Sequence, residues 1–150
     1  NFQFMPRTIR NYAIDYNKNK IIELKKTEDS FASAANYLKT IGWKKNQPCF
    51  FKINLKDNIP KKYLNSSARG IKNKKKVIFF KNYIKNSNLN VDDDLMASII
   101  IPDKDIIPGS ETLSPAYLIF ENYEKILNWN RSLRFALAVC TLKDNFKNEI

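Results

Sequence analysis

The sequence contains no histidine, only two cysteines and only three glycines among its 150 residues. Without histidine, a Ser-His or Cys-His catalytic dyad is impossible, and most zinc sites are excluded as well. Cys49 and Cys140 lie too far apart in the sequence for a CxxC redox or zinc motif. Cys140 belongs to an apolar run, so we expect a buried free thiol, with a disulfide as the open alternative.

Long hydrophobic runs are also absent. Even the longest apolar stretches, such as residues 97–101, are too short to cross a bilayer. The hydrophobic fraction of 43% and the aromatic fraction of 13% nevertheless exclude a disordered chain. At this length a real hydrophobic core is expected, in one domain or in one domain plus part of another.

Acidic residues are few relative to basic ones: 15 Asp and Glu against 26 Lys and Arg give a net charge of +11. This excess favours an anionic partner, such as nucleic acid, an acidic lipid surface or an acidic polymer. Lysines are spread over a chain rich in Asn and Ile, so an ordinary solvated surface is the simpler interpretation. The basic run 72–76, beside Phe79, Phe80 and Tyr83, is of the kind that can bind single-stranded nucleic acid. It is short and no RNA-binding motif follows, so we expect a solvated loop and no nucleic-acid partner.

Hydrophobic spacing predicts three helices. Pro6 suits the first turn of the first helix. The second is predicted to begin at a cap formed by Asp29 or Ser30 and to stop at Gly42. The predicted apolar stripes are Ile9, Tyr12, Ala13 and Tyr16; Phe31, Ala34, Ala35 and Leu38; and Phe135, Ala138, Val139, Leu142 and Phe146.

The middle of the chain has β-type patterning. Residues 49–53, 95–101 and 116–120 are predicted strands, the last two paired antiparallel. Residues 56–76 are predicted to form a long exposed loop, and residues 77–84 fit either a helix or a strand. The predicted fold class is therefore α+β, with helices on either side of a small β-rich insertion.

Three short segments carry the strongest family signal: QFMP at residues 3–6, ANYLKTIGW at residues 35–43, and a strand followed by WNRS at residues 129–132. In this order they resemble segments of the membrane-bound lytic murein transglycosylase B family. The resemblance implies the C-terminal part of a lysozyme-like, mainly helical catalytic domain. Residues 1–47 would be a partial catalytic domain, residues 48–120 the β-rich insertion with its basic loop, and residues 121–150 the closing helices.

The resemblance also implies an activity and a place of action. Enzymes of this family break the β-1,4 bond between N-acetylmuramic acid and N-acetylglucosamine, and they leave a 1,6-anhydro sugar. The implied partner is the peptidoglycan glycan strand, and no cofactor is required. The implied location is the bacterial periplasm or cell envelope, with membrane association only through a possible upstream anchor.

The family's single catalytic glutamate precedes the QFMP motif, so the resemblance places it upstream of Asn1. We therefore expect the chain alone to bind glycan weakly and to be inactive. Glu111 is an unsuitable substitute, since it matches no family motif and its loop lacks the apolar surroundings that keep a carboxyl protonated. The alternative is a non-catalytic peptidoglycan-binding or scaffold protein that uses the same groove residues.

By motif match, the resemblance places five residues in a sugar-binding groove: Gln3, Tyr37, Trp129, Asn130 and Phe135. Gln3 and Asn130 would form hydrogen bonds, and the three aromatic side chains would pack on sugar rings. The simpler alternatives are core positions for Trp129 and Phe135, a helix cap for Asn130 and a frayed terminus for Gln3.

The resemblance further implies an EF-hand-like calcium loop between the first two helices. Its candidate ligands are Asp15, Asn17, Asn19, the backbone carbonyl of Ile21, and Asp29. Lys20 replaces the glycine expected at the sixth position, and two of the ligands are neutral amides, so calcium binding is expected to be weak or absent. The alternative is a polar loop in which Asp15 and Asp29 cap helices.

Overall fold

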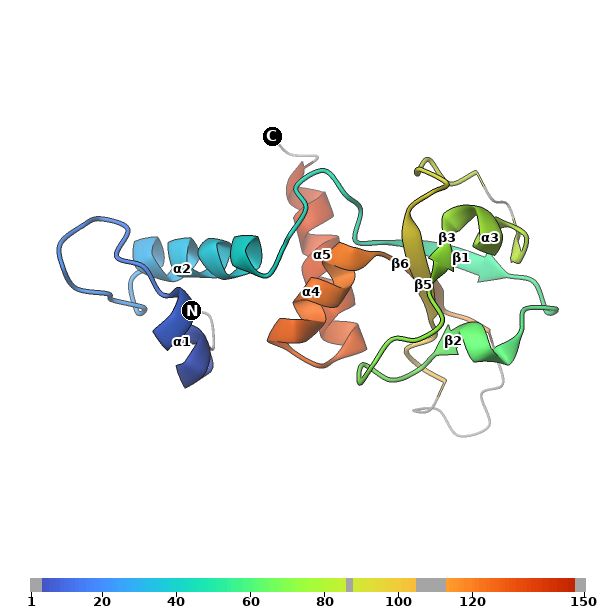
Figure 1. The fold of residues 1–150 in the computed structure, drawn as a ribbon, viewed down its shortest axis with the longest axis horizontal. Helices are drawn as coiled ribbons and strands as arrows, with labels where there is room; N and C mark the ends of the chain where they lie inside the picture. Colours follow the sequence, from blue (N-terminus) through green and yellow to red (C-terminus); the bar gives the residue numbers. More distant parts are fainter. Residues whose placement is uncertain (1–3, 86–87, 105–112, 148–150) are drawn as a thin grey trace. The chain divides into compact units, whose positions relative to one another are not determined.

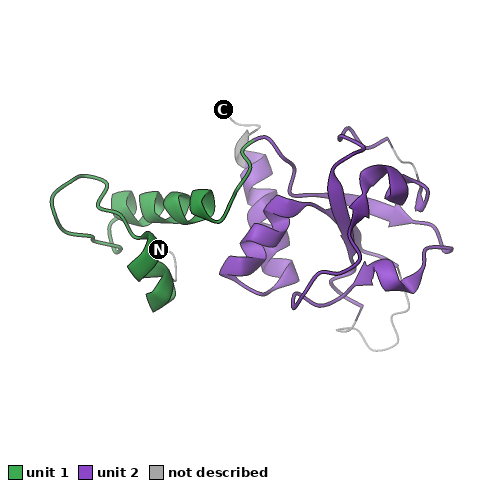
Figure 2. Ribbon diagram, in the orientation of Figure 1, with its two compact units in different colours: residues 1–45 green, residues 46–150 purple. Residues whose placement is uncertain are grey.

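The protein divides into two compact units, distinguished by colour in Figure 2. The computed structural model describes residues 4–85, 88–104 and 113–147. Unit 1 covers residues 1–45 and unit 2 covers residues 46–150, and unit 2 contains the whole described sheet together with three helices. The α+β class is thereby confirmed, whereas the three-part division at residues 47 and 120 stays a prediction.

Unit 1 consists of two helices and the loop that joins them. The first helix, α1 (Pro6–Tyr12), ends before Tyr16, so the predicted stripe is too long at its end. The second helix, α2 (Thr27–Thr40), begins two residues before Asp29, so neither Asp29 nor Ser30 is its N-cap. That part of the prediction is wrong because the carboxylate of Asp29 bonds the preceding loop instead.

The C-terminus of α2 confirms the predicted stop at Gly42. This glycine has a φ of 91°, a left-handed conformation that glycine adopts without a Cβ penalty. The N–H of Trp43 donates to the carbonyl of Leu38 at 3.0 Å, and the N–H of Gly42 donates to that of Lys39 at 3.1 Å. These paired bonds form a Schellman motif, which satisfies carbonyls at the end of the helix.

The buried face of α2 differs from the predicted stripe. Phe31 is 61% exposed, and Ala35 is exposed as well. The buried residues of the helix are Asp29, Ser30, Ser33, Ala34 and Tyr37. Polar side chains occupy this face because they bond the preceding segment; the hydroxyl of Ser33, for example, accepts the N–H of Ile14 at 3.0 Å.

The centre of unit 2 is an antiparallel sheet of three strands, β1 (Phe50–Leu55), β6 (Ala116–Ile119) and β5 (Met96–Ile100). Strand β6 lies between the other two and pairs antiparallel with both, so the predicted pairing of β5 with β6 is confirmed. The sheet order is β2-β5-β6-β1-β4, and β3 also pairs with β5.

Short elements extend this sheet. They are the 3-10 helix Lys61–Tyr63, β2 (Leu64–Asn65), β3 (Lys75–Lys76), α3 (Val77–Lys81) and β4 (Ile84–Lys85). The predicted exposed loop at residues 56–76 is therefore partly wrong, because it contributes two strands and the buried side chains of Ile59 and Tyr63. Residues 77–84, which fitted a helix or a strand, form the helix α3 and the start of β4.

Both faces of the sheet are covered. On one face, α3 contributes Val77 and Phe80 to a cluster that includes Ile99 and Leu118. Strand side chains alternate between faces, so Ile100 points to the opposite face, where it is also fully buried. Figure 1 shows the helices α4 (Glu121–Trp129) and α5 (Leu133–Lys147) on the side of the sheet opposite to α3.

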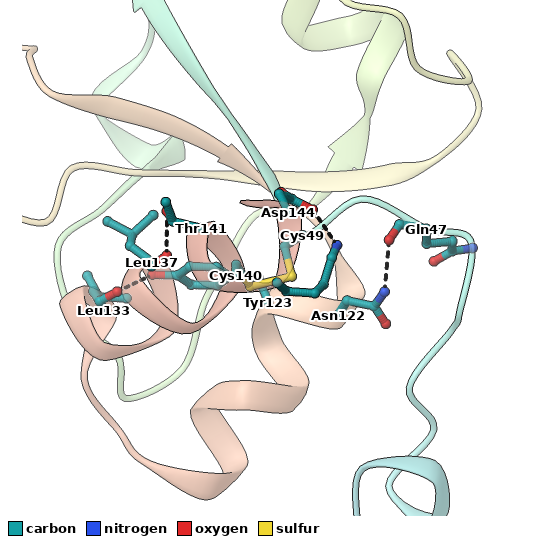
Figure 3. The surroundings of a disulfide bond; sticks show 10 residues. Gln47, Cys49, Asn122, Tyr123, Leu133, Leu137, Cys140, Thr141 and Asp144 are labelled. Atoms are coloured by element: carbon teal, nitrogen blue, oxygen red, sulfur yellow. Dashed lines mark hydrogen bonds and ion pairs between the residues drawn. A yellow bond between two sulfur atoms is a disulfide. The ribbon is translucent and has the colours of Figure 1, made fainter. Parts of the chain in front are cut away.

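A disulfide bond connects the start of the sheet to α5. Cys49 and Cys140 are both fully buried, their Cα atoms are 6.0 Å apart, and Figure 3 shows the bond beside Tyr123. The expectation of a buried free thiol is therefore wrong in its redox state and right in its burial. The link fixes which face of α5 points inward.

The buried face of α5 is rotated from the predicted stripe. Its buried residues are Leu133, Ala136 and Cys140, at spacings of three and four. Phe135 and Leu142, which the apolar pattern placed in the core, are 38% and 57% exposed. The helix was predicted correctly, but its orientation was not.

Within the described residues, none of the helices has the length and apolar composition needed to span a bilayer.

Candidate functional site

The loop between α1 and α2 is closed by the oxygens predicted to bind calcium. The carboxylate of Asp15 accepts the N–H groups of Asn19 at 3.2 Å and Lys20 at 2.7 Å. The amide oxygens of Asn17 and Asn19 accept the N–H groups of Asn19 and Ile21 at 3.1 and 2.8 Å. These bonds define the loop conformation by side-chain contacts within the chain itself.

The fit of this loop to calcium is incomplete. Lys20, at the position where glycine is expected, has a φ of 72°, and Lys18 has a φ of 59°. A left-handed conformation costs a residue with a Cβ about 1–2 kcal/mol. In the part of the chain that the structure describes, no group of three or more His, Cys, Asp or Glu residues is placed to hold a metal ion. The spacing of the ligand oxygens suits calcium, but two of the ligands are neutral amides. Weak or absent calcium binding therefore stays a prediction.

Asp29 is the one buried carboxyl among the described residues, at 1% exposure. Its two oxygens accept the N–H groups of Tyr16 at 3.0 Å and Glu23 at 2.8 Å. The N–H of Glu23 first, and that of Tyr16 second, hold the pKa of this carboxyl below its ordinary value. A carboxyl that stays ionised cannot protonate a leaving group, so Asp29 is a structural anion and no general acid.

The side chain of Tyr37, a predicted groove residue, packs inside unit 1. It is 7% exposed, and its ring meets that of Tyr12 edge-on with centroids 4.9 Å apart. Burial raises the pKa of the Tyr37 phenol, with a smaller contribution from Tyr12. Most of the ring therefore stabilises the α1–α2 pair, which leaves a narrow edge for a ligand. Gln3 lies outside the described residues.

Three predicted groove residues come from the end of α4, the turn after it and the first turn of α5 in unit 2. Trp129 ends α4 and is half-buried, Asn130 is exposed, and Phe135 in α5 is 38% exposed. The backbone N–H of Asn130 donates to the carbonyl of Ile126 at 3.1 Å and so caps α4. The cap thus uses the backbone of Asn130, and its side chain is at the surface.

Two buried side chains hold this turn in place, and the sequence analysis did not single them out. The hydroxyl of Tyr123 donates to the carbonyl of Leu133 at 2.6 Å. The amide of Asn122 donates to the carbonyl of Gln47 at 3.0 Å, as Figure 3 shows. An asparagine and a tyrosine in the first turn of a helix, just after a strand, are the available signal, because each needs a hydrogen-bond partner when it is buried.

The described glutamates do not resemble a general acid. Glu121 pairs with Lys125 at 3.3 Å, and Glu124 pairs with Lys74 at 2.7 Å. Neither is buried, so neither has the apolar surroundings that favour a protonated carboxyl. Glu111 lies outside the described residues.

The basic run of residues 72–76 is partly neutralised by acids of unit 2. Lys74 contacts Glu124, and Lys76 contacts Asp94 at 2.7 Å. Phe80, one of the aromatics that follow the run, is fully buried. These contacts agree with the interpretation of the run as ordinary surface, and the absence of a nucleic-acid partner stays a prediction.

A hollow of about 600 Å³ lies over the start of β1 and the end of α5, and it is lined by Phe50, Phe51 and Asp144 among others. None of the predicted groove residues lines it. Asp144, at the edge of this hollow, pairs with Lys143 at 2.8 Å. This hollow therefore lies apart from the α4–α5 turn.

A family model described as the transglycosylase SLT domain matches residues 1–144 of the chain. No curated protein matches the chain. Among solved structures, SltB3 of Pseudomonas aeruginosa, in complex with NAG-NAM-pentapeptide, is 30% identical with a TM-score of 0.77. The alignment covers 97% of this chain and 37% of SltB3.

Two other solved structures share the fold at lower identity. Catenated lytic transglycosylase SltB1 of Pseudomonas aeruginosa is 20% identical with a TM-score of 0.73, over 98% of this chain and 46% of SltB1. Escherichia coli lytic transglycosylase Slt35, in complex with calcium, is 23% identical with a TM-score of 0.67, over 93% of this chain and 41% of Slt35. The chain thus spans less than half the length of each of these relatives.

Proposed function

Because the chain belongs to the family of SLT-domain transglycosylases, we propose that it takes part in non-hydrolytic cleavage of the bond between N-acetylmuramic acid and N-acetylglucosamine in peptidoglycan. The observation that carries this proposal is the match of the family model to residues 1–144. The bound NAG-NAM-pentapeptide of SltB3 supports a peptidoglycan glycan strand as the ligand. The exposed amide and aromatic rings of the α4–α5 turn suit such a sugar.

The proposed chemistry needs one carboxyl group. As an acid it protonates the oxygen that leaves the anomeric carbon C1, and as a carboxylate it then accepts the proton of the substrate's own 6-hydroxyl. The bond from C1 to the leaving oxygen breaks, and a bond from C1 to O6 forms. No water is consumed, so the product is a 1,6-anhydro sugar rather than the hydrolysis product of a two-carboxyl glycosidase.

We assign this chain the binding of glycan, with the acid supplied from outside the described residues. Asp29 is the one buried carboxyl in the described part, and hydrogen bonds keep it ionised. The family order places the catalytic glutamate before the QFMP motif.

The second candidate is a non-catalytic peptidoglycan-binding or scaffold protein. The observation in its favour is the same lack of a suitable acid among the described carboxyls. It uses the same residues on the α4–α5 turn, and it differs from the first candidate only in whether the acid exists elsewhere in the protein.

A periplasmic or other envelope location is supported by the disulfide between Cys49 and Cys140. Disulfides persist in oxidising compartments such as the bacterial periplasm, and they are rare in the reducing cytosol. The peptidoglycan ligand of the proposal lies in the same compartment.

Incubation of the purified chain with peptidoglycan sacculi tests the proposal. We expect the chain to sediment with sacculi and to release no anhydro-muropeptides detectable by mass spectrometry. Release of anhydro-muropeptides by this chain alone would mean that it contains a catalytic acid. Failure to sediment with sacculi would refute glycan binding. Extension of the chain to include the family's glutamate-bearing helix should restore release; if it does not, the scaffold function is favoured.

A further inference from the structure

A second hollow, of about 410 Å³, lies in unit 2 between the loop that follows β2 and the helix α4. Its lining residues are Ala68, Arg69, Gly70, Ile71, Glu124, Leu127, Asn128 and Arg131. In Figure 1 the loop between β2 and β3 extends toward the helix pair α4 and α5. We call this site the arginine hollow, because an arginine contributes to it from each side.

The loop side of the arginine hollow is held by hydrogen bonds at its base. The side chain of Asn65 donates to the carbonyls of Lys72 at 3.2 Å and Ile99 at 2.9 Å, and it accepts the N–H of Lys72 at 2.9 Å. Gly70 has a φ of 90°, which allows the turn at the tip of the loop. Arg69 is therefore carried by a loop anchored to the central strand β5.

The helix side is equally defined. Leu127 on α4 is buried, and the neighbouring Asn128 is exposed with its amide at the hollow. Arg131 follows directly after Trp129 and Asn130, the predicted sugar-binding residues of the turn. The arginine hollow is thus contiguous in sequence with the proposed glycan site.

The charges of the arginine hollow are unbalanced. Its one carboxylate, Glu124, is paired with Lys74 at 2.7 Å. Arg69 and Arg131 are both exposed, and their guanidinium groups make no hydrogen bond or ion pair with any other described residue. Arg69 and Arg131 therefore line one hollow together with Asn128 and Leu127.

Such a pair of guanidinium groups recognises carboxylates. The planar fork of arginine matches the two oxygens of a carboxylate and forms charge-assisted hydrogen bonds that a lysine cannot form in the same geometry. Peptidoglycan glycan chains carry peptide stems that contain free carboxylates, and the stems are attached to the same sugars that the proposed site binds.

We propose that the arginine hollow binds a carboxylate of the peptide stem and thereby selects glycan strands that still carry their peptides. The inference rests on the proposed function, since it assumes that the α4–α5 turn binds the glycan. It goes beyond that function by assigning Arg69 and Arg131 to substrate selection.

The test compares two soluble ligands: GlcNAc–MurNAc oligosaccharides that carry their peptide stems, and the same oligosaccharides whose stems an amidase has removed and whose freed lactyl carboxyl groups have been converted to amides. The full chain, the variant R69A/R131A, the charge-keeping variant R69K/R131K and the control K72A/K85A are measured for binding to both. Lys72 and Lys85 are exposed and do not line the arginine hollow, so the control loses the same charge at other sites. Circular dichroism verifies that each variant is folded.

We expect the full chain and K72A/K85A to bind the stem-bearing oligosaccharides roughly three- to tenfold more tightly than the stem-free ones. The preference should be lost in R69A/R131A and reduced in R69K/R131K, with binding to the stem-free oligosaccharides unchanged in both. If R69A/R131A keeps the preference, or if the control loses it as well, the inference is overturned while the proposed function stands. If the full chain binds neither preparation, both are overturned.

Discussion

Tyr123 is fully buried, and its hydroxyl is 2.6 Å from the carbonyl of Leu133, at the start of α5. Tyr123→Phe removes this bond and leaves the carbonyl without its buried donor, so we expect the free energy of unfolding to fall by about 1–3 kcal/mol. Urea denaturation of both proteins measures the difference. An unchanged value would mean that the bond does not stabilise the turn.

Tyr123 should also make the stability of the folded protein decrease at alkaline pH. Burial raises the pKa of Tyr123 above its ordinary value of about 10. The folded state then keeps a proton that the unfolded state loses, so the contribution is complete below pH 10 and is lost as the pH rises above it. Between pH 10 and 11 we expect wild-type stability to fall more steeply than that of Tyr123→Phe, by up to about 1.4 kcal/mol per pH unit. Parallel curves would contradict the raised pKa.

For a substitution of Ser98 in β5 we expect no loss of stability. It is 1% exposed, and its hydroxyl has no hydrogen-bond partner in the described part of the chain. Ser98→Ala should therefore leave the free energy of unfolding unchanged or raise it by up to about 1 kcal/mol. The matched control is Asn122→Ala, which loses the bond to Gln47 and should destabilise by about 1–3 kcal/mol. Equal losses in the two variants would refute this distinction.

At the scale of elements, the disulfide is the main constraint on α5. Closing the chain between Cys49 and Cys140, which are 91 positions apart, stabilises the fold by about 2–5 kcal/mol. Denaturation of the oxidised protein and of the Cys49→Ala/Cys140→Ala variant should differ by this amount. The control is wild type with reductant, which should match the variant. A difference near zero would indicate that the two cysteines are not linked in solution.

The loop between α1 and α2 should keep its fold without calcium. Its conformation rests on hydrogen bonds accepted by Asp15, Asn17, Asn19 and Asp29. For dissociation constants of about 1 mM or weaker, 1 mM calcium should raise the melting temperature by less than about 2 °C relative to EDTA. Differential scanning calorimetry measures the shift, with Asp15→Asn as the variant that should abolish any rise. An increase of about 5 °C or more would establish a genuine calcium site.

Helix positions could be predicted from the sequence, whereas their orientations could not. Both α2 and α5 lie where apolar spacing placed them, but their buried faces are rotated. In α2 the inward face is set by Ser33 and Asp29, whose bonds to the preceding loop no hydrophobic pattern reveals. In α5 it is set by Cys140, whose disulfide partner, Cys49, lies 91 positions earlier in the sequence.

The short strands could not be predicted from the sequence either. The segments β2 and β3 have two residues each, and both pair with β5. Two residues are too few to show the alternation that predicts a strand, and β3 consists of two lysines. The family motifs identified the family, which the match of the family model to residues 1–144 confirms. The roles of Trp129 and Asn130 in binding sugar stay predictions.

At the scale of the whole molecule, the residues predicted to bind glycan are divided between the two units. Tyr37 belongs to unit 1, and Trp129, Asn130 and Phe135 belong to unit 2. The net charge of +11 favours the carboxylate-bearing strands that the arginine hollow is proposed to select. Catalysis is proposed to depend on a carboxyl group that is not among the described ones.

The most direct test of the central claim is an NMR titration of the isotopically labelled chain with a peptide-free GlcNAc–MurNAc tetrasaccharide. If the chain is the glycan-binding part of an SLT transglycosylase, the resonances of Trp129, Asn130 and Phe135 should shift together in one saturable process. Resonances in the hollow over β1 and α5 should stay unchanged. Absence of shifts at the α4–α5 turn, at glycan concentrations well into the millimolar range, would contradict the account.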